Sequence, residues 1–140
     1  FRAVDQVLDE LDGRVRAIVV DIHAEATSEK IALGYHLDGR VSAVIGTHTH
    51  VQTSDERVLP RGTACLTDAG MTGVVESVLG LDPDVVVDRF VGRFGGQFTL
   101  AQGPARLQGA LIDIDAQSGQ ASTIRRISID EGDDVAALEV

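Results

Sequence analysis

Cysteine, aromatic residues and long apolar runs are all scarce in this sequence of 140 residues, which has one cysteine and no tryptophan. The lone cysteine, Cys65, cannot form a disulfide within the chain, and this fits a reducing compartment. No apolar run reaches the roughly 18 residues of a membrane-spanning helix, and no signal-peptide pattern is present. We therefore expect a soluble protein without membrane contacts.

Basic residues are also few, because 12 Lys and Arg stand against 22 Asp and Glu and the net charge is -10. They form no cluster that could neutralise a nucleic-acid backbone, so we expect no direct binding of DNA or RNA. A small anionic substrate remains compatible with this charge if bound cations supply the attraction.

The length of the chain predicts one domain, and a domain of this size buries roughly 70% of the surface that is exposed in the unfolded chain. The sequence begins with Phe1 rather than methionine, and the amphipathic spacing of Val4, Val7 and Leu8 starts at once. We interpret the chain as cut from a longer protein, with residues 1–130 as part of a single domain and the acidic residues 131–140 as a flexible tail.

Hydrophobic periodicity predicts alternating helices and strands, followed by a β-rich final third. Thr27 or Ser28 is the expected cap of the second helix, and Asp82 caps the helix that starts with Pro83. A hairpin turn is expected at 58–63 and a glycine-rich loop at 68–73. The predicted elements are helices over 2–11, 28–37 and 83–91, and strands over 15–20, 41–46, 64–67, 105–114 and 121–129.

Two histidines directly follow the predicted strand over 41–46, in the stretch Thr47-His48-Thr49-His50. In an extended backbone, side chains two residues apart point to the same face, so His48 and His50 would converge. Imidazole is the commonest neutral metal ligand at neutral pH. The pattern therefore indicates a metal site at a strand end, although two exposed loop histidines would give the same pattern.

A third histidine, His23, follows the predicted strand over 15–20. The two strands are joined through a helix, and the carboxyl ends of such parallel strands meet at one edge of the sheet, about 5 Å apart when they are neighbours. We therefore expect His23, His48 and His50 to share one cluster. His36 lies late in the predicted helix, where the helix dipole explains a histidine.

Longer sequence blocks surround these histidines: DIHAEATSEK over 21–30, LDGRVSAV over 37–44, GTHTHVQT over 46–53, DER over 55–57 and DAGMTG over 68–73. In this order and spacing they resemble the YmdB-type branch of the calcineurin-like metallophosphoesterases. The resemblance covers most of residues 4–130, and its blocks are far more specific than an isolated pair of histidines.

The resemblance implies an α/β fold in which a β-sandwich is flanked by helices, with metals at the strand ends. It implies a cytoplasmic bacterial phosphodiesterase with a two-metal site, which hydrolyses 2',3'-cyclic nucleotides and other phosphodiesters through a metal-activated hydroxide. His23 and His48 would bind one metal and His50 the other. Imidazole and carboxylate ligands together favour Fe or Mn, with Zn or Mg as alternatives.

The sequence departs from the family pattern because the other ligands are absent. The family also has an early Asp, a bridging Glu followed by Asn, and an Asn-His pair that includes the candidate proton donor. All of these belong to its N-terminal half. We therefore expect a calcineurin-like fold that is incomplete at the N-terminus, no catalytic proton donor within this chain, and little activity of the chain alone.

Several further residues have a functional and a structural interpretation. Asp21 could orient an imidazole, or it could cap the segment that follows its strand. Thr72 and Gly73, in the glycine-rich loop, could bring backbone N–H groups to a phosphate, or the loop could simply turn.

The remaining polar candidates favour structural roles. Glu25 and Glu29 fit the dipole at a helix start better than a contact with the site, and Arg57 is expected to pair with Asp55 rather than with a phosphate. Cys65 is expected in the core. Thr47 and Thr49 are assigned to the face opposite the histidines and are interpreted as structural.

A phosphodiesterase is the leading hypothesis for the intact protein, with a small phosphodiester or nucleotide as its partner. The alternative is a regulatory protein that senses nucleotide or metal without turnover, and an inactive remnant is the simplest third possibility. The sequence leaves a homo-oligomer open.

Overall fold

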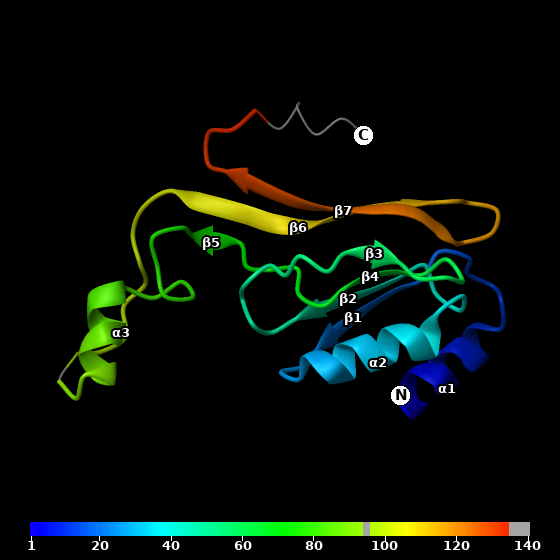
Figure 1. Ribbon diagram of the computed structural model, residues 1–140, viewed down its shortest axis with the longest axis horizontal. Helices are drawn as coiled ribbons and strands as arrows, with labels where there is room; N and C mark the ends of the chain where they lie inside the picture. The colour runs from blue at the N-terminus through cyan, green and yellow to red at the C-terminus, as the bar shows by residue number, and fades with distance from the viewer. Residues whose placement is uncertain (94–95, 135–140) are drawn as a thin grey trace. The chain divides into compact units, whose positions relative to one another are not determined.

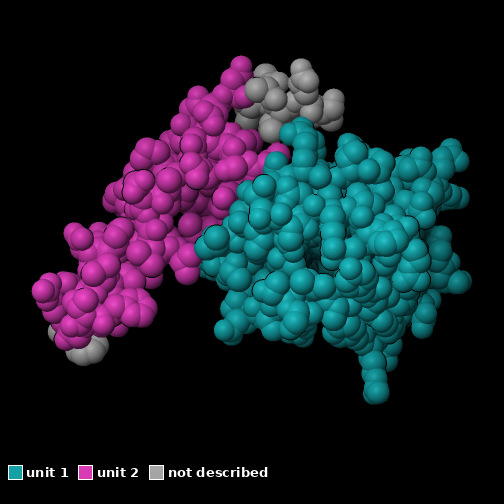
Figure 2. Space-filling model, viewed as in Figure 1, with its two compact units in different colours: residues 1–70, 110–126 teal, residues 71–109, 127–140 magenta. Residues whose placement is uncertain are grey.

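The computed structural model describes residues 1–93 and 96–134, and these form a mixed α/β structure. The chain divides into two compact units, which Figure 2 colours separately: unit 1 consists of 1–70 and 110–126, and unit 2 of 71–109 and 127–140. The elements, labelled in Figure 1, are α1 (Arg2–Leu11), β1 (Val19–His23), α2 (Thr27–Leu37), β2 (Ala43–Thr47), β3 (Arg57–Val58), β4 (Ala64–Leu66), β5 (Gly73–Val74), α3 (Pro83–Phe90), β6 (Ala105–Ile114) and β7 (Ala121–Asp130).

Unit 1 contains a four-stranded sheet in the order β1-β2-β4-β3. β1, β2 and β4 run parallel, and β3 pairs antiparallel with β4 across the hairpin turn predicted at 58–63. α2 connects β1 to β2, which confirms the predicted strand-helix-strand unit. His23 is the register partner of Thr47, so β1 and β2 end side by side.

Both faces of this sheet carry apolar contacts within unit 1. α2 lies along one face (Figure 1), where Leu33 and Leu37 pack with Val44. On the other face, Ala43 and Ala64 pack against Ala121 of β7. Because alanine side chains are small, Ala121 can approach the sheet closely.

Cys65 is half-buried and packs against the cluster under α2, as predicted for a core cysteine. Burial raises the pKa of its thiol to about 11, and the negative charge of Asp38 adds to this effect. The thiol is therefore protonated at neutral pH and is no nucleophile.

Two sequence predictions were wrong in detail. The first strand begins at Val19 rather than residue 15, and it is only partly buried, on one face, since Val19 is 58% exposed. The second helix begins at Thr27 after Ala26, without a side-chain cap, so neither Thr27 nor Ser28 is its cap. The backbone N–H groups of Glu29 and Lys30 bond to the carbonyl oxygen of Ala26 instead.

Unit 2 contains α3 and the short antiparallel pairing of β5 with β6, in which Gly73 is the register partner of Arg106. α3 begins as predicted, because the Asp82 carboxylate accepts hydrogen bonds from the N–H groups of Asp84 and Val85. β6 and β7 match the strands predicted over 105–114 and 121–129 to within one residue, and the boundary between the units falls inside both strands.

The acidic segment predicted as a flexible tail begins at residue 131, and the Glu131 N–H donates to the Ala105 carbonyl oxygen at 2.8 Å. Residues 135–140 of that segment lie outside the described residues. In the described part of the chain, no helix has the length and apolar character needed to cross a membrane.

Candidate metal site at the ends of β1 and β2

The exposed face at the end of β1 carries Asp21 and His23, and the neighbouring residue of β2 on that face is Thr47. His23 Nδ1 lies 3.1 Å from Thr47 Oγ1, and the Thr47 hydroxyl donates to Asp21 Oδ1 at 3.1 Å. The parallel register brings these three side chains together, because side chains of register partners point to the same face.

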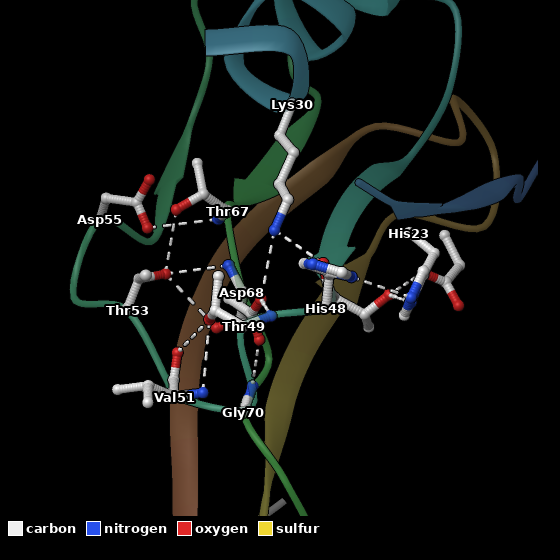
Figure 3. A network of polar contacts seen from close by, with 12 residues as sticks. His23, Lys30, His48, Thr49, Val51, Thr53, Asp55, Thr67, Asp68 and Gly70 are labelled. Carbon is white, nitrogen blue, oxygen red and sulfur yellow. Dashed lines mark hydrogen bonds and ion pairs between the residues drawn. The ribbon is translucent and has the colours of Figure 1, made fainter. Parts of the chain in front are cut away.

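His48 completes this arrangement, since its Nδ1 lies 3.2 Å from His23 Nε2. The two imidazole rings are nearly perpendicular, with centroids 4.9 Å apart (Figure 3). Both side chains are exposed. The structure therefore brings together two of the three histidines predicted as metal ligands.

The third histidine, His50, is not placed with them. β2 ends at Thr47, and the next residues form a bend in which His48 has φ 113° and His50 has φ 63°. Positive φ values lie outside the extended region of backbone conformation, so the predicted alternation of an extended strand is wrong for 48–50. Within 1–93 and 96–134, no group of three or more His, Cys, Asp or Glu side chains is close enough to hold a metal.

A buried ion pair lies under this bend. Lys30 Nζ is 3.2 Å from Asp68 Oδ2, and the two side chains are only 2% and 1% exposed. Lys30 also donates to the Thr47 carbonyl oxygen at 2.7 Å. Asp68 accepts from the N–H groups of Thr49, at 2.8 Å, and Gly70, at 2.9 Å. Figure 3 shows how this pair ties the bend to α2 and to the end of β4.

These contacts keep Asp68 ionised despite its burial. Burial raises the pKa of the Asp68 carboxyl, but the hydrogen bonds from Gly70, Thr49 and Lys30 outweigh this effect, and the net pKa is lowered. A buried carboxylate with one cation and two N–H donors has most of its acceptor sites satisfied. The pair can therefore hold the bend in a backbone conformation that histidine rarely adopts.

A second carboxylate fixes the return of the chain after the bend. Asp55 accepts a hydrogen bond from the Thr67 N–H at 3.2 Å, and the Thr53 hydroxyl accepts one from the Asp68 N–H at 2.9 Å. Burial raises the pKa of Asp55, but its bonds to Thr53 and Thr67 lower it overall. The segment after His50 is thus bound to the strand end that carries Asp68.

Sequence reasoning missed Thr47, Lys30 and Asp68 as parts of this site. Thr47 was assigned to the opposite face from the histidines, which holds only within a single extended strand. The signal that finds it is the register between β1 and β2, where Thr47 is level with His23. Lys30 and Asp68 lie in two of the resembling blocks, but no local pattern links them.

The other predicted residues are distributed differently. Thr72 is exposed and Gly73 begins β5, and both belong to unit 2, whereas Asp68 and Gly70 of the same predicted loop belong to unit 1. The predicted pairing of Arg57 with Asp55 was wrong, because the Arg57 guanidinium contacts Tyr35 and Asp55 bonds to Thr67.

Outside the bend, the other candidates lie on α2 or just before it. His36 lies in the last turn of α2 and also pairs with Asp5 at 2.9 Å. Glu25 and Glu29 are exposed beside and inside the first turn of α2.

The donor atoms of His23 and His48 fit a metal ion. Two nitrogen ligands at tetrahedral positions around a cation, with metal–nitrogen distances of 2.0–2.1 Å, lie about 3.3 Å apart. The observed separation of 3.2 Å between His23 Nε2 and His48 Nδ1 is close to this value. The two imidazoles can therefore supply two ligands of one transition metal, and further ligands are needed to complete its coordination.

Comparison with known sequences gives a consistent set of relatives. The family model described as YmdB-like protein matches residues 1–127. A 2',3'-cyclic-nucleotide 2'-phosphodiesterase of Bacillus subtilis is 50% identical over 131 residues, covering 94% of this chain and 50% of the relative. A putative phosphatase/phosphodiesterase of Mycoplasma pneumoniae is 37% identical over 116 residues, covering 82% of this chain and 41% of the relative.

Two solved structures have the same fold as this chain. A hypothetical protein from Thermus thermophilus superposes with a TM-score of 0.83 at 42% identity, covering 93% of this chain and 50% of that one. A novel phosphatase from Mycoplasma pneumoniae also gives 0.83, at 33% identity, covering 99% of this chain and 49% of that one. The chain thus spans about half the length of these relatives or less.

Proposed function

Because the chain belongs to the YmdB-like protein family, as its sequence blocks predicted, we propose that it supplies part of the active site of a metal-dependent phosphodiesterase. The substrate class is small phosphodiesters, with 2',3'-cyclic nucleotides first among them, by analogy with the Bacillus subtilis relative. We also propose that the mixed α/β structure is part of a calcineurin-like metallophosphoesterase fold and that the protein works in the cytoplasm.

The observation that carries this proposal is the pair of facing imidazole nitrogens on His23 and His48, 3.2 Å apart. Both rings are exposed. The His23 ring contacts Thr47, and the bend that carries His48 is tied to Lys30 and Asp68. A pair that is accessible and positioned in this way fits the two-ligand side of a metal site. His50 remains our proposed ligand for a second metal.

The chain's own residues hold and orient the metals. His23 and His48 would present their imidazole nitrogens to a metal, and Asp21 and Thr47 fix the orientation of the His23 ring. Divalent cations, Fe or Mn first and Zn or Mg as alternatives, would neutralise the phosphodiester and supply Lewis-acid chemistry for its hydrolysis. With a net charge of -10, bound cations would supply the attraction for an anionic substrate. We assign no proton donor to this chain.

Replacement of the histidines in the manganese-loaded full-length protein tests the proposal. His48→Ala and His23→Ala should each lower the rate of 2',3'-cyclic AMP hydrolysis by more than about 100-fold, since even residues that only support metal ligands cost 10–100-fold. His36→Gln is the control, because His36 pairs with Asp5 between the helices.

The same assay separates the alternatives. Equal hydrolysis by the wild type and His48→Ala would contradict the metal assignment. Tight binding of the cyclic nucleotide in calorimetry without turnover would favour the sensing role over catalysis. His50→Ala, measured in parallel, decides whether the third histidine is a ligand.

A further inference from the structure

We propose that Asp21 and Thr47 act as positioning residues that fix the tautomer of His23, so that its Nε2 carries no hydrogen and can bind a metal. The inference rests on the metal site proposed above. It is carried by the continuous series of contacts from Asp21 Oδ1 to Thr47 Oγ1 and on to His23 Nδ1, each at 3.1 Å.

The first step follows from counting hydrogens. A threonine hydroxyl has one hydrogen, and a carboxylate can only accept. The Thr47 hydrogen is therefore donated to Asp21, so that towards His23 the Thr47 oxygen can only accept. The His23 ring must then carry its hydrogen on Nδ1, and a neutral ring protonated there has a free lone pair on Nε2.

The second step concerns His48, whose Nδ1 lies 3.2 Å from His23 Nε2, the nitrogen with the free lone pair. Without a cation, His48 Nδ1 must carry a hydrogen and donate it to His23 Nε2, since two lone pairs would repel. With a cation between the rings, both nitrogens must be free of hydrogen, and His48 must carry its hydrogen on Nε2. His23 thus keeps one tautomer throughout, while His48 changes tautomer when metal binds.

A second threonine–carboxylate pair in the chain serves as a control, because it separates the positioning of a histidine from a general contribution of the threonine to strand stability. On β7, the Thr123 hydroxyl donates to the Asp113 carboxylate at 2.5 Å, on an exposed surface of unit 1. Both threonines lie in strands and bond to a carboxylate, and only Thr47 also contacts a histidine. A loss that is specific to Thr47 therefore reports on the histidine.

The direct test is the side-chain ¹⁵N spectrum of the histidines in the full chain, recorded at about pH 8, where ordinary imidazole is neutral. We expect His23 to be the Nδ1–H tautomer with and without Zn²⁺, and His48 to change from Nδ1–H to Nε2–H on Zn²⁺ addition. A His23 ring protonated on Nε2 in the wild type would overturn the proposal.

Zinc affinity, measured by calorimetry, gives the second readout. Thr47→Val should lower the affinity about 10–100-fold and give a mixture of His23 tautomers, whereas Thr47→Ser keeps the hydroxyl and should stay within about threefold of the wild type. Thr123→Val should leave both readouts unchanged. Asp21→Ala, on the exposed face of β1, checks the same series of contacts without removing a side chain of β2.

An affinity within twofold of the wild type for both Thr47→Val and Asp21→Ala would overturn the inference. This outcome is distinct from failure of the proposed function. If the wild type bound zinc with the expected tautomers and hydrolysed no phosphodiester, the proposed activity would fail and the positioning role would stand. If His48→Ala abolished hydrolysis while Thr47→Val kept full zinc affinity, the proposed activity would stand and the positioning role would fail.

Discussion

Lys30 and Asp68 place two opposite charges almost entirely out of contact with water, at 2% and 1% exposure. Removing charges from water is costly, and their mutual attraction offsets that cost only with good geometry and further hydrogen bonds. Here Lys30 also bonds to the Thr47 carbonyl, and Asp68 to two N–H groups. Each charge thus depends on the other, and the backbone around His48 depends on both.

Lys30→Met should therefore destabilise unit 1 by about 3 kcal/mol, because it leaves the Asp68 carboxylate buried without its cation. The measurement is urea unfolding at pH 7, followed by circular dichroism. Arg40→Met is the control, since the Arg40–Asp5 pair is partly exposed, at 38% and 33%, and solvent screens such pairs so that they contribute little to stability. Equal losses in the two variants would mean that the buried pair contributes no more than a surface contact.

At the scale of single residues, the sequence predicted the residue types of the site better than their roles. His23 and His48 were expected to meet, and their facing nitrogens do. The position of His50 could not be predicted, because two non-glycine residues with positive φ interrupt the extended backbone. The Asp68 carboxylate fixes that conformation by accepting a hydrogen bond from the Thr49 N–H. Asp68 lies 18 or more residues later in the chain, so no local sequence pattern predicts this contact.

At the scale of elements, the strand-helix-strand unit was predictable because hydrophobic periodicity and turn residues record it locally. The helix beginning at Pro83 was equally clear, since Asp82 caps it with its side chain. The register between β1 and β2 could not be predicted, although this register is the reason that Thr47 contacts His23. Register depends on which side chains fit together across strands, and a single sequence leaves it open.

Gly46 connects this register to the site, because it lies in β2 directly before Thr47. A Cβ at this position would overlap the Thr67 carbonyl oxygen and would lie 2.8 Å from Lys30 Cδ. The glycine thus allows β2 to approach the end of β4 and the Lys30 side chain to reach Asp68.

Gly46→Ala should cost about 3 kcal/mol, since overpacking against a backbone carbonyl forces the strand to move. It should also disturb the contact between His23 and His48, and both effects can be measured by urea unfolding and by histidine ¹⁵N shifts. Gly109→Ala is a suitable comparison, because a Cβ there would meet the Ile127 side chain at an ordinary 3.6 Å. A Gly46 variant as stable as the Gly109 variant would show that the close approach is not required.

At the scale of the whole molecule, acidic side chains dominate the charge, and many of them are stabilised in the ionised form. Among the residues that the structure describes, the pKa values of six carboxyls are lowered by their contacts: those of Asp5, Asp55, Glu56, Asp68, Asp115 and Asp130. For Asp5, the bond from Arg40 is the main cause, followed by the bond from His36. These groups lie in both units, so acid should affect the entire described structure.

Stability should accordingly fall on acidification. A carboxyl with a lowered pKa in the folded state binds protons less readily there than in the unfolded chain, so its contribution is fully present above the unfolded value of about 4 and is lost as the pH falls through the folded value. We expect the unfolding temperature to be nearly constant from pH 7 to about pH 5 and to decrease steadily below that. Calorimetric scans between pH 7 and pH 3 measure this decrease.

Asp68→Asn removes one titrating group, so the unfolding temperature of this variant should start lower and decrease less steeply with acid. A steeper decrease than in the wild type would contradict the lowered pKa of Asp68 and, with it, the view that the ionised carboxylate holds the bend at His48.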